Sequence, residues 1–340
     1  MWFSFRARIN NIQQYQKAFS RKRALNFLKL LVSHFQSLWL KKPVMKARPF
    51  ALSVEPTPLC QLRCPECPTG AGELDRPTGK MTLGLFSKII EESSPFVFYL
   101  NLYFQGEPLL HPEIGAFIRK AKQHYIYTTI STNGQKLNKE MCSELVEAGI
   151  SRIVVSLDGF TQPVYEIYRR KGHVETVKTG ISELLKAREK RGAKYPLVVV
   201  QYLAFSHNRH ELSKIKQWCR DQGVDKLEIK RAQINEFGDR TVAPDQNKSR
   251  YKTGSKGKFE IKGKARNYCW RQWSSAAITW DGTMVPCCYD KNADHPMGHL
   301  ADNSFEKIWN GLNANTFRNV ILTNRSSISI CRNCPEGRFF

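Results

Sequence analysis

Short strand-like runs alternate with longer helical patterns between residues 51 and 231 of this 340-residue chain. Successive strand–helix units of a parallel sheet or barrel have this pattern in a sequence. The predicted strands are 52–55, 97–104, 127–131, 153–157, 197–203 and 227–230. The predicted helices between them are 83–93, 114–124, 139–148, 174–190 and 211–222. A complete barrel needs eight such units, so we expect an α/β fold with a partial barrel over residues 50–232.

The chain after this barrel reads differently. Residues 233–265 are polar and basic, which predicts a linker or mobile lid. In residues 266–340 the runs 276–280 and 284–286 flank an Asp281-Gly282 turn, which predicts a β-hairpin, and 305–309 is helical in pattern. This second unit has few long apolar segments but several cysteines. We therefore expect a metal or cluster to stabilise it.

The formal net charge of +23 is concentrated outside the predicted barrel. Residues 1–50 hold eleven Lys or Arg and no acidic residue, and residues 246–266 hold eight against one Glu. The longest apolar stretch, 25–40, is interrupted by Lys29, His34 and Gln36, so no membrane span is predicted. The N-terminus lacks a signal-peptide pattern. We expect a cytoplasmic protein.

Residues 1–49 are predicted to be a basic helical extension. Five apolar residues share one helical face: Phe27, Leu28, Leu31, Phe35 and Leu38. We expect this face to pack on the barrel while the basic face is solvated. Contact with an anionic membrane surface is the alternative. Nucleic acid is not an expected partner, because the sequence shows no recognised RNA-binding fold motif and only its positive charge favours such binding.

Three of the ten cysteines directly follow the first predicted strand, in a CxxxCxxC pattern formed by Cys60, Cys64 and Cys67. Three thiolates on one loop can hold three irons of a [4Fe-4S] cube and leave the fourth iron open. Structural zinc normally takes four protein ligands, so zinc is the weaker interpretation here.

Further motifs follow the next predicted strands in order. They are Gln105-Gly106-Glu107-Pro108, Ser131-Thr132-Asn133-Gly134, Ser156-Leu157-Asp158-Gly159, and then Tyr165 and Arg169. Together with the cysteine loop, this series resembles the radical S-adenosylmethionine superfamily. The resemblance implies a TIM-like (β/α)6 partial barrel. Two positions depart from the family pattern: Glu66 stands where an aromatic residue is usual, and Gln105 where glycine is usual.

The resemblance also implies how S-adenosylmethionine is bound. Its ammonium, carboxylate and ribose need an acceptor, a cation, and hydroxyl or amide partners. The residues expected to bind it are Gly106, Glu107, Asn133, Ser156 and Arg169. The family mechanism is reductive cleavage by a [4Fe-4S] cluster, giving a 5′-deoxyadenosyl radical that abstracts hydrogen from a substrate. A reductant such as flavodoxin or ferredoxin is implied, and no catalytic acid or base is assigned.

A second group of cysteines lies in the C-terminal unit and resembles the SPASM type of extension, in its shortened, twitch-like form with one auxiliary [4Fe-4S] cluster. The expected ligands are Cys269, Cys287, Cys331 and Cys334. Cys287 is preferred to Cys288 because the Pro286-Cys287 pair is the matching element. A closed zinc site remains an alternative here.

The resemblance leaves the substrate open. We expect a peptide or protein first and an amino sugar or polyol second, with the auxiliary cluster assisting an oxidation. The competing hypothesis is a non-catalytic zinc-binding module that uses its basic segments to bind RNA or membrane.

Overall fold

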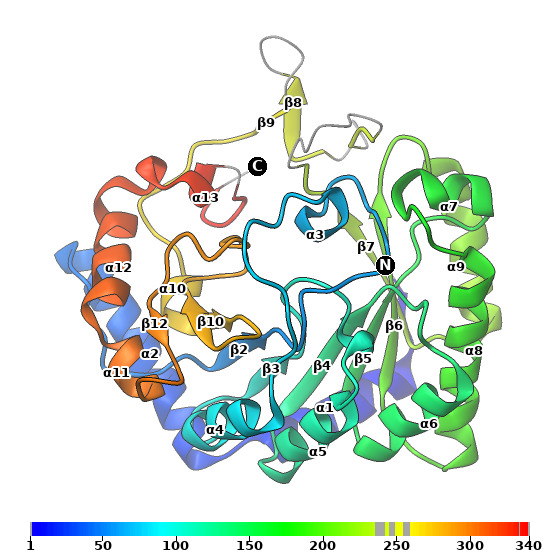
Figure 1. The fold of residues 1–340 in the computed structure, drawn as a ribbon, viewed down its shortest axis with the longest axis horizontal. Coiled ribbons are helices and arrows are strands. Elements are labelled where there is room, and N and C mark those ends of the chain that lie inside the picture. Colours follow the sequence, from blue (N-terminus) through cyan, green and yellow to red (C-terminus); the bar gives the residue numbers. More distant parts are fainter. Residues whose placement is uncertain (1, 235–241, 245–248, 254–258, 333, 339–340) are drawn as a thin grey trace. The chain divides into compact units, whose positions relative to one another are not determined.

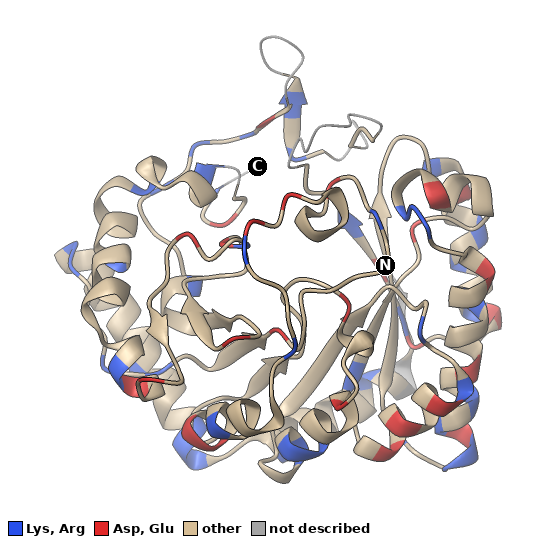
Figure 2. Cartoon of the chain, in the orientation of Figure 1, with Lys and Arg blue, Asp and Glu red and all other residues tan. Residues whose placement is uncertain are grey.

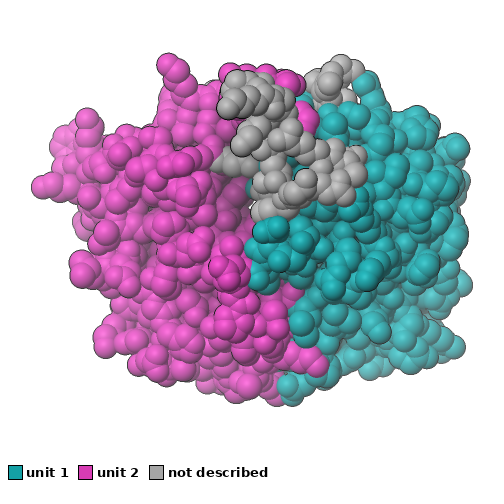
Figure 3. Space-filling model, turned by 45° about the horizontal axis from the view of Figure 1, so that its top comes forward, with its two compact units in different colours: residues 1–17, 59–74, 106–249 teal, residues 18–58, 75–105, 250–340 magenta. Residues whose placement is uncertain are grey.

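The computed structural model describes residues 2–234, 242–244, 249–253, 259–332 and 334–338 (Figure 1). The chain forms two compact units, which Figure 3 distinguishes by colour. Unit 1 comprises residues 1–17, 59–74 and 106–249, and unit 2 comprises residues 18–58, 75–105 and 250–340. Each unit therefore combines segments that are far apart in the sequence. The domain boundaries expected at residues 50, 233 and 266 stay a prediction.

Unit 1 is built on a mainly parallel group of strands. They are β1 (Trp2–Phe3), β4 (Tyr127–Thr132), β5 (Arg152–Ser156), β6 (Leu197–Ala204) and β7 (Lys226–Arg231). β4 to β7 pair in parallel in chain order, and β1 pairs antiparallel with β7 at the edge. β5 and the first half of β6 are rich in Val and almost entirely buried, as expected for parallel strands that are covered on both faces.

The helices of unit 1 follow these strands. They are α1 (Phe5–Ala18), α3 (Pro68–Ala71), α5 (Ile114–Gln123), α6 (Lys139–Ala148), α7 (Gln162–Tyr168), α8 (Val174–Lys190) and α9 (Leu212–Asp221). α6 illustrates local control of a helix: the Asn138 side chain accepts the Met141 N–H, and Gly149 ends the helix at φ +81°. α1 is anchored by Ala7, which packs against Val154 and Val199.

Charges are mixed on the outer helices of unit 1. Figure 2 shows both acidic and basic residues along α6, α8 and α9. On α8 they form pairs one turn apart, such as Lys178 with Glu175 at 2.7 Å and Lys186 with Glu183 at 2.9 Å. Exposed pairs of this kind add little stability but make the surface well solvated.

Unit 2 contains β2 (Ala51–Val54), β3 (Tyr99–Asn101), β10 (Ser275–Ile278), β11 (Thr283–Val285) and β12 (Gly298–His299). β2 pairs in parallel with β3 and with β10, and β10, β11 and β12 form an antiparallel series. The predicted hairpin is therefore present, and its first strand extends the pairing of β2. β3 is shorter than the predicted 97–104, and four residues after it the Gln105 N–H donates to the Glu55 carboxylate.

The segment predicted as a linker contains regular structure. β8 (Tyr251–Thr253) and β9 (Phe259–Ile261) pair antiparallel, with Tyr251 opposite Ile261. Part of this segment, residues 235–241, 245–248 and 254–258, lies outside the described residues.

The helices of unit 2 are α2 (Arg21–Leu40), α4 (Leu83–Ser93), α10 (Arg271–Ser274), α11 (Phe305–Trp309), α12 (Leu312–Asn324) and α13 (Ser329–Arg332). A core cluster formed by Leu30, Ala47, Trp273 and Leu322 joins α2, α10 and α12. Among the described residues, no helix combines the length and apolarity needed to cross a membrane.

The predicted buried face of the N-terminal helix is wrong in part: Leu38 packs against the core cluster of unit 2, but three of the five residues, Phe27 among them, are exposed. Leu28 and Phe35 are 56% and 64% exposed, and the buried face of α2 instead carries Leu30 and the polar residues Arg23, Ser33, His34 and Ser37. The apolar residues recur at the predicted helical spacing, but the hydrogen bonds of the polar residues decide which side of the helix faces inward.

Candidate functional site

The predicted cluster loop lies in unit 1 and leads into α3. The Cys67 N–H donates to the Cys64 carbonyl at 3.2 Å, which turns the chain between the last two cysteines. Gly70 allows α3 to lie against this turn: a Cβ at that position would be 2.5 Å from the Cys64 nitrogen and 2.6 Å from its oxygen. The loop is therefore held by backbone packing that only glycine permits.

The three thiols of this loop influence one another electrostatically. Burial raises the pKa of Cys60 to about 11 and that of Cys64 to about 12. The charge of Cys67 raises both pKa values further, whereas Arg169 lowers them. Thiols grouped in this way are costly to ionise unless a positive centre is bound among them, which fits ligation of an iron–sulfur cluster.

No three His, Cys, Asp or Glu side chains within the described part of the chain are grouped closely enough to hold a single metal ion. The thiolates of a cube bind different iron atoms, so they need not converge on one point.

Glu107 is buried and links the cysteine loop to the end of β4. Its N–H donates to the Leu59 carbonyl at 2.7 Å. Its Oε1 accepts from the Thr132 hydroxyl at 2.7 Å and from the Leu109 N–H at 3.1 Å, and its Oε2 accepts the Asn133 N–H at 2.7 Å. Burial raises the pKa of this carboxyl, and these hydrogen bonds oppose the rise. One acceptor position on Oε2 is left for another donor.

Asn133 connects the same elements through its side chain. Its Nδ2 lies 3.6 Å from Cys60 Sγ, and its Oδ1 accepts from Gln61 Nε2 at 3.3 Å. Ser156 is the buried last residue of β5. Both residues stand at the carboxyl ends of neighbouring parallel strands, the edge where barrels of this kind build active sites. Gly106 precedes Glu107 with φ +75°.

Arg169 places a guanidinium beside the cysteine loop. Its Nε donates to Asp158 Oδ2 at 2.6 Å, its Nη1 lies 3.8 Å from Cys64 Sγ, and its Cζ lies over the Tyr168 ring. Although burial opposes it, the charges of Asp158 and Cys64 raise the pKa of Arg169. The structure thus brings Glu107, Asn133 and Arg169 to the cysteine loop.

Two positioning residues were missed from the sequence. Asp158 lies in the Ser156–Gly159 motif, which does not predict a role for it. Its Oδ1 accepts the Leu203 N–H at 2.6 Å, and this hydrogen bond fixes the carboxylate whose Oδ2 holds Arg169. Asn208 donates from Nδ2 to the carbonyls of Asp158 and Leu203, at 2.8 and 2.9 Å. An Asn soon after a strand suggests a turn, but it gives no indication of a partner 50 residues away.

The second cysteine group lies in unit 2. Cys269, Cys287, Cys331 and Cys334 are each less than 10% exposed. Burial raises the pKa of Cys269 and Cys334 to about 11, and each of these thiols is also affected by the charge of another member of the group. The Cys287 thiol is affected by Cys269 and Cys334 as well as by its neighbour Cys288. Cys288 is half-buried and lies 3.8 Å from Arg271 Nη1.

A buried arginine accompanies these thiols. Arg325 is fully buried, and its Nη1 donates to the Tyr268 carbonyl at 2.9 Å. Its Nε and Nη2 donate to no oxygen or nitrogen atom among the described residues. Although burial opposes it, the charges of Cys269, Cys334 and Cys331 raise the pKa of Arg325. A buried cation without a carboxylate partner fits a site that carries negative charge when loaded.

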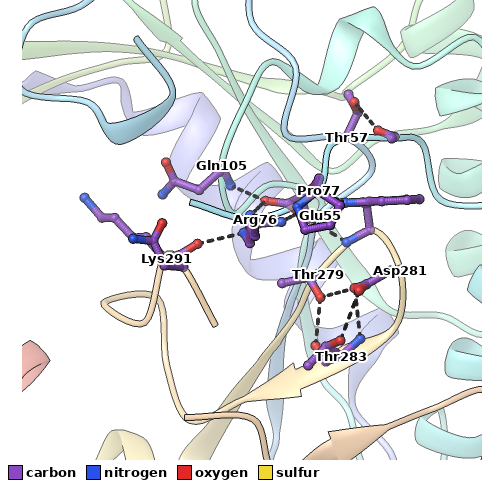
Figure 4. A network of polar contacts seen from close by, with 12 residues as sticks. Glu55, Thr57, Arg76, Pro77, Gln105, Thr279, Asp281, Thr283 and Lys291 are labelled. Carbon is purple, nitrogen blue, oxygen red and sulfur yellow. Dashed lines mark hydrogen bonds and ion pairs between the residues drawn. The ribbon is translucent and has the colours of Figure 1, made fainter. Parts of the chain in front are cut away.

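The hairpin of unit 2 is fixed by a polar network around Glu55 (Figure 4). The Glu55 carboxylate accepts both terminal nitrogens of Arg76, at 2.8 and 2.5 Å, and the N–H groups of Gln105 and Trp280, both at 3.2 Å. Arg76 Nε donates to the Lys291 carbonyl at 2.8 Å. The network therefore ties the ends of β2 and β3 to the turn after β10 and to the loop that follows the cysteine pair.

Asp281, in the same turn, accepts from Thr279 and Thr283. Its hydrogen bonds are those of a turn residue.

Two family models match the chain. The first describes the radical SAM superfamily and matches residues 54–219, and the second describes the SPASM iron–sulfur cluster-binding domain and matches residues 269–335. The chain belongs to the radical SAM superfamily. It is an enzyme that binds S-adenosylmethionine and a [4Fe-4S] cluster, and its SPASM domain binds auxiliary iron–sulfur clusters. A non-catalytic zinc module is thereby excluded.

Curated relatives are modification enzymes. A tungsten-containing aldehyde ferredoxin oxidoreductase cofactor-modifying protein of Pyrococcus furiosus is 27% identical over 316 residues, covering 83% of this chain and 86% of that protein. The PqqA peptide cyclase of Bradyrhizobium diazoefficiens is 28% identical over 186 residues, which are 54% of this chain and 47% of the cyclase.

Solved structures confirm the predicted fold class, an α/β partial barrel with a small cysteine-rich C-terminal domain. BtrN in complex with AdoMet and 2-DOIA matches with a TM-score of 0.54 at 19% identity, over 85% of this chain and 94% of BtrN. SuiB of Streptococcus suis bound to S-adenosylmethionine matches with a TM-score of 0.64 at 12% identity, over 90% of this chain and 76% of SuiB.

Proposed function

We propose that this radical SAM enzyme abstracts a hydrogen atom from a peptide or protein, with an amino sugar or polyol as the second candidate substrate. The observation that carries the reaction class is the convergence of Glu107, Asn133 and Arg169 on the cysteine loop of unit 1. Similar proteins support placing a peptide before a sugar or polyol. One relative is a peptide cyclase, and SuiB has been seen with a precursor peptide, whereas BtrN has been seen with 2-DOIA.

The residues of unit 1 suit the roles expected for them. We propose that Cys60, Cys64 and Cys67 hold a [4Fe-4S] cluster, which together with S-adenosylmethionine supplies a carbon-centred radical once an electron is added. Arg169 suits the methionine carboxylate, because Asp158 fixes its Nε edge and leaves the other side of the guanidinium toward Cys64.

Glu107 suits the methionine ammonium, because its Oε2 retains an acceptor position after its protein hydrogen bonds are counted. Gly106 lets the chain turn just before this carboxylate. Asn133 and Ser156, at adjacent strand ends, suit the ribose hydroxyls.

In unit 2 we propose that Cys269, Cys287, Cys331 and Cys334 ligate one auxiliary [4Fe-4S] cluster with no open iron. Cys287 is buried like Cys269, Cys331 and Cys334 whereas Cys288 is half-buried, which supports Cys287 over Cys288. Arg325 would neutralise part of the charge of the loaded site. A cluster held by these four thiolates would supply a one-electron acceptor, and the reaction would then be an oxidation of the substrate.

The first test is an anaerobic purification followed by analysis of iron, sulfide and zinc and by assay of 5′-deoxyadenosine with dithionite and S-adenosylmethionine. We expect about eight irons per chain and formation of the nucleoside. Cys64→Ala should abolish its formation, while Cys331→Ala should retain about four irons in the first site. Cys142→Ala is the matched control, since Cys142 is buried in α6. Zinc at the second site would contradict the auxiliary cluster.

The second test concerns the substrate. Pools of synthetic peptides and of purified amino sugars should be compared for their ability to raise 5′-deoxyadenosine above the rate without substrate. Turnover on a carbohydrate in the absence of any peptide would reverse the proposed order.

We also propose flavodoxin or ferredoxin as the electron donor and the cytoplasm as the working compartment. None of the ten cysteines, all of which lie among the described residues, forms a disulfide, which suits a reducing compartment. Replacement of dithionite by reduced flavodoxin should sustain turnover, and fractionation of cells should recover the chain without secretion.

A further inference from the structure

α2 exposes an unbroken apolar ridge. Leu25, Leu28, Val32, Phe35 and Trp39 follow one another at alternating intervals of three and four residues, so they lie along one line of the helix. Their exposed fractions are 49%, 56%, 52%, 64% and 83%. At 20 residues the helix is about 30 Å long, and the ridge runs along most of it.

The opposite face of α2 is polar and fixed in place. Three nitrogens of Arg23 donate to backbone carbonyls, two to Ser94 and one to Ala18, at 2.7 to 3.1 Å. The Asn26 amide exchanges two hydrogen bonds with the backbone of Arg48. The Ser37 hydroxyl accepts the Val44 N–H at 2.8 Å and the Trp273 ring N–H at 3.2 Å.

These contacts determine the rotation of α2 about its axis. If the helix turned to bury its ridge, the backbone groups that these side chains satisfy would lose their partners. The hydrogen bonds of the inner face therefore keep the ridge directed outward. The helix packs beside α12 through Leu30 and Leu322 (Figure 1). The arrangement is the reverse of an ordinary surface helix, whose apolar stripe faces the core.

The charge around the ridge identifies what would cover it. α2 contains no acidic residue. Exposed basic residues stand at both of its ends, Arg21 and Lys22 at one and Lys41 and Lys42 at the other, and exposed Lys29 lies between them. A second copy of the helix would bring like charges together with no carboxylate on α2 to pair them. Nucleic acid would bind the cations and its bases could stack on Phe35 and Trp39, but the aliphatic part of the ridge, Leu25, Leu28 and Val32, would stay exposed to water.

An anionic lipid surface matches both features, since acyl chains accept the apolar side chains while headgroups pair with the cations. We propose that α2 lies in the plane of an anionic membrane, with Leu28, Val32, Phe35 and Trp39 inserted below the headgroups. Trp39 is suited to the boundary between headgroup and acyl chain. This assignment is independent of the substrate proposed above.

The test is co-sedimentation of the reconstituted protein with vesicles of phosphatidylcholine alone or of phosphatidylcholine and phosphatidylglycerol in equal amounts. We expect binding only to the anionic vesicles, and weaker binding as salt is raised. Phe35→Ser with Trp39→Ser should weaken binding at least tenfold. Leu312→Ser is the matched control, because Leu312 is 82% exposed on α12 of the same unit and should bind like the wild type.

A second variant, Lys22→Glu with Lys29→Glu, keeps the apolar ridge and should also weaken binding. Both pairs of substitutions should leave 5′-deoxyadenosine formation unchanged, which shows that the protein is folded and loaded. Equal binding of the wild type and the Ser variant would overturn the proposal. So would failure to bind anionic vesicles, including the case in which light scattering shows that the ridge instead forms a dimer.

Discussion

The ion pair of Glu55 with Arg76 makes a quantitative prediction about stability. Both side chains are buried, at 0% and 7% exposure, and all four acceptor positions of the Glu55 carboxylate are used. Glu55→Gln would remove the charge opposite a buried guanidinium and turn an NH2 group toward a backbone N–H. Loss of one partner of such a pair costs about 3–5 kcal/mol.

This cost corresponds to a measurable change in melting temperature. If the 340-residue chain unfolds in one transition, the melting temperature should fall by about 4–7 °C. Glu306→Gln is the matched control, because Glu306 pairs with Arg48 at the surface of the same unit, at 59% and 37% exposure. An exposed pair contributes at most about 1 kcal/mol, so the control should shift by about 1.5 °C or less.

The assay is thermal unfolding of the reconstituted proteins at one scan rate, followed by circular dichroism. The double variant Glu55→Leu with Arg76→Met should recover only part of the loss, because no buried charge is then left without a partner but the N–H groups of Gln105 and Trp280 lose their acceptor. Equal shifts for Glu55→Gln and Glu306→Gln would refute the reasoning, since burial would then make no difference to the value of the pair.

Three further predictions follow from the two cysteine sites and from α2. Gly70→Ala should lower the iron content from about eight to about four irons per chain, because the new Cβ would lie 2.5 Å from the Cys64 backbone. Gly84→Ala is the control and should retain all of the iron, because the space around Gly84 is open. Iron analysis of the two purified variants tests this prediction. Arg325→Met should lower the reduction potential of the auxiliary cluster, because a positive charge beside the cysteines is lost; a tenfold change in the redox equilibrium corresponds to about 59 mV. An EPR-monitored redox titration measures this potential. An unchanged potential would contradict the placement of the Arg325 charge beside the cluster. Burial lowers the pKa of His34, so the unfolded chain binds a proton at this histidine more readily than the folded chain. A change from pH 7.5 to pH 5.5 should therefore lower the melting temperature of the wild type more than that of His34→Leu. Parallel pH profiles of the two proteins would show that His34 is not the cause.

The sequence predicted regular elements well where the pattern is local. The helices at 83–93, 139–148 and 174–190 have the predicted bounds, because cap residues and amphipathic spacing lie within each segment. α12 was missed, since Leu312–Asn324 is rich in Asn and its apolar residues are widely spread; Phe317 and Ile321 are buried only because partners exist for them elsewhere in the unit.

By itself the sequence determined the chemistry that depends on spacing along the chain: the CxxxCxxC loop, the polar residues at successive strand ends, and the cysteines of the C-terminal unit. These features are local because each motif occupies a few neighbouring residues, and the order of strands sets where they meet. Only the tertiary structure decided that Asp158 holds Arg169 while Asn208 fixes the Asp158 backbone, that Glu55 joins Arg76 to the turn at Trp280, and that α2 turns its apolar ridge outward. Those outcomes depend on hydrogen bonds between residues far apart in the sequence, and periodicity gives the spacing of a helical face but not the side to which it is turned.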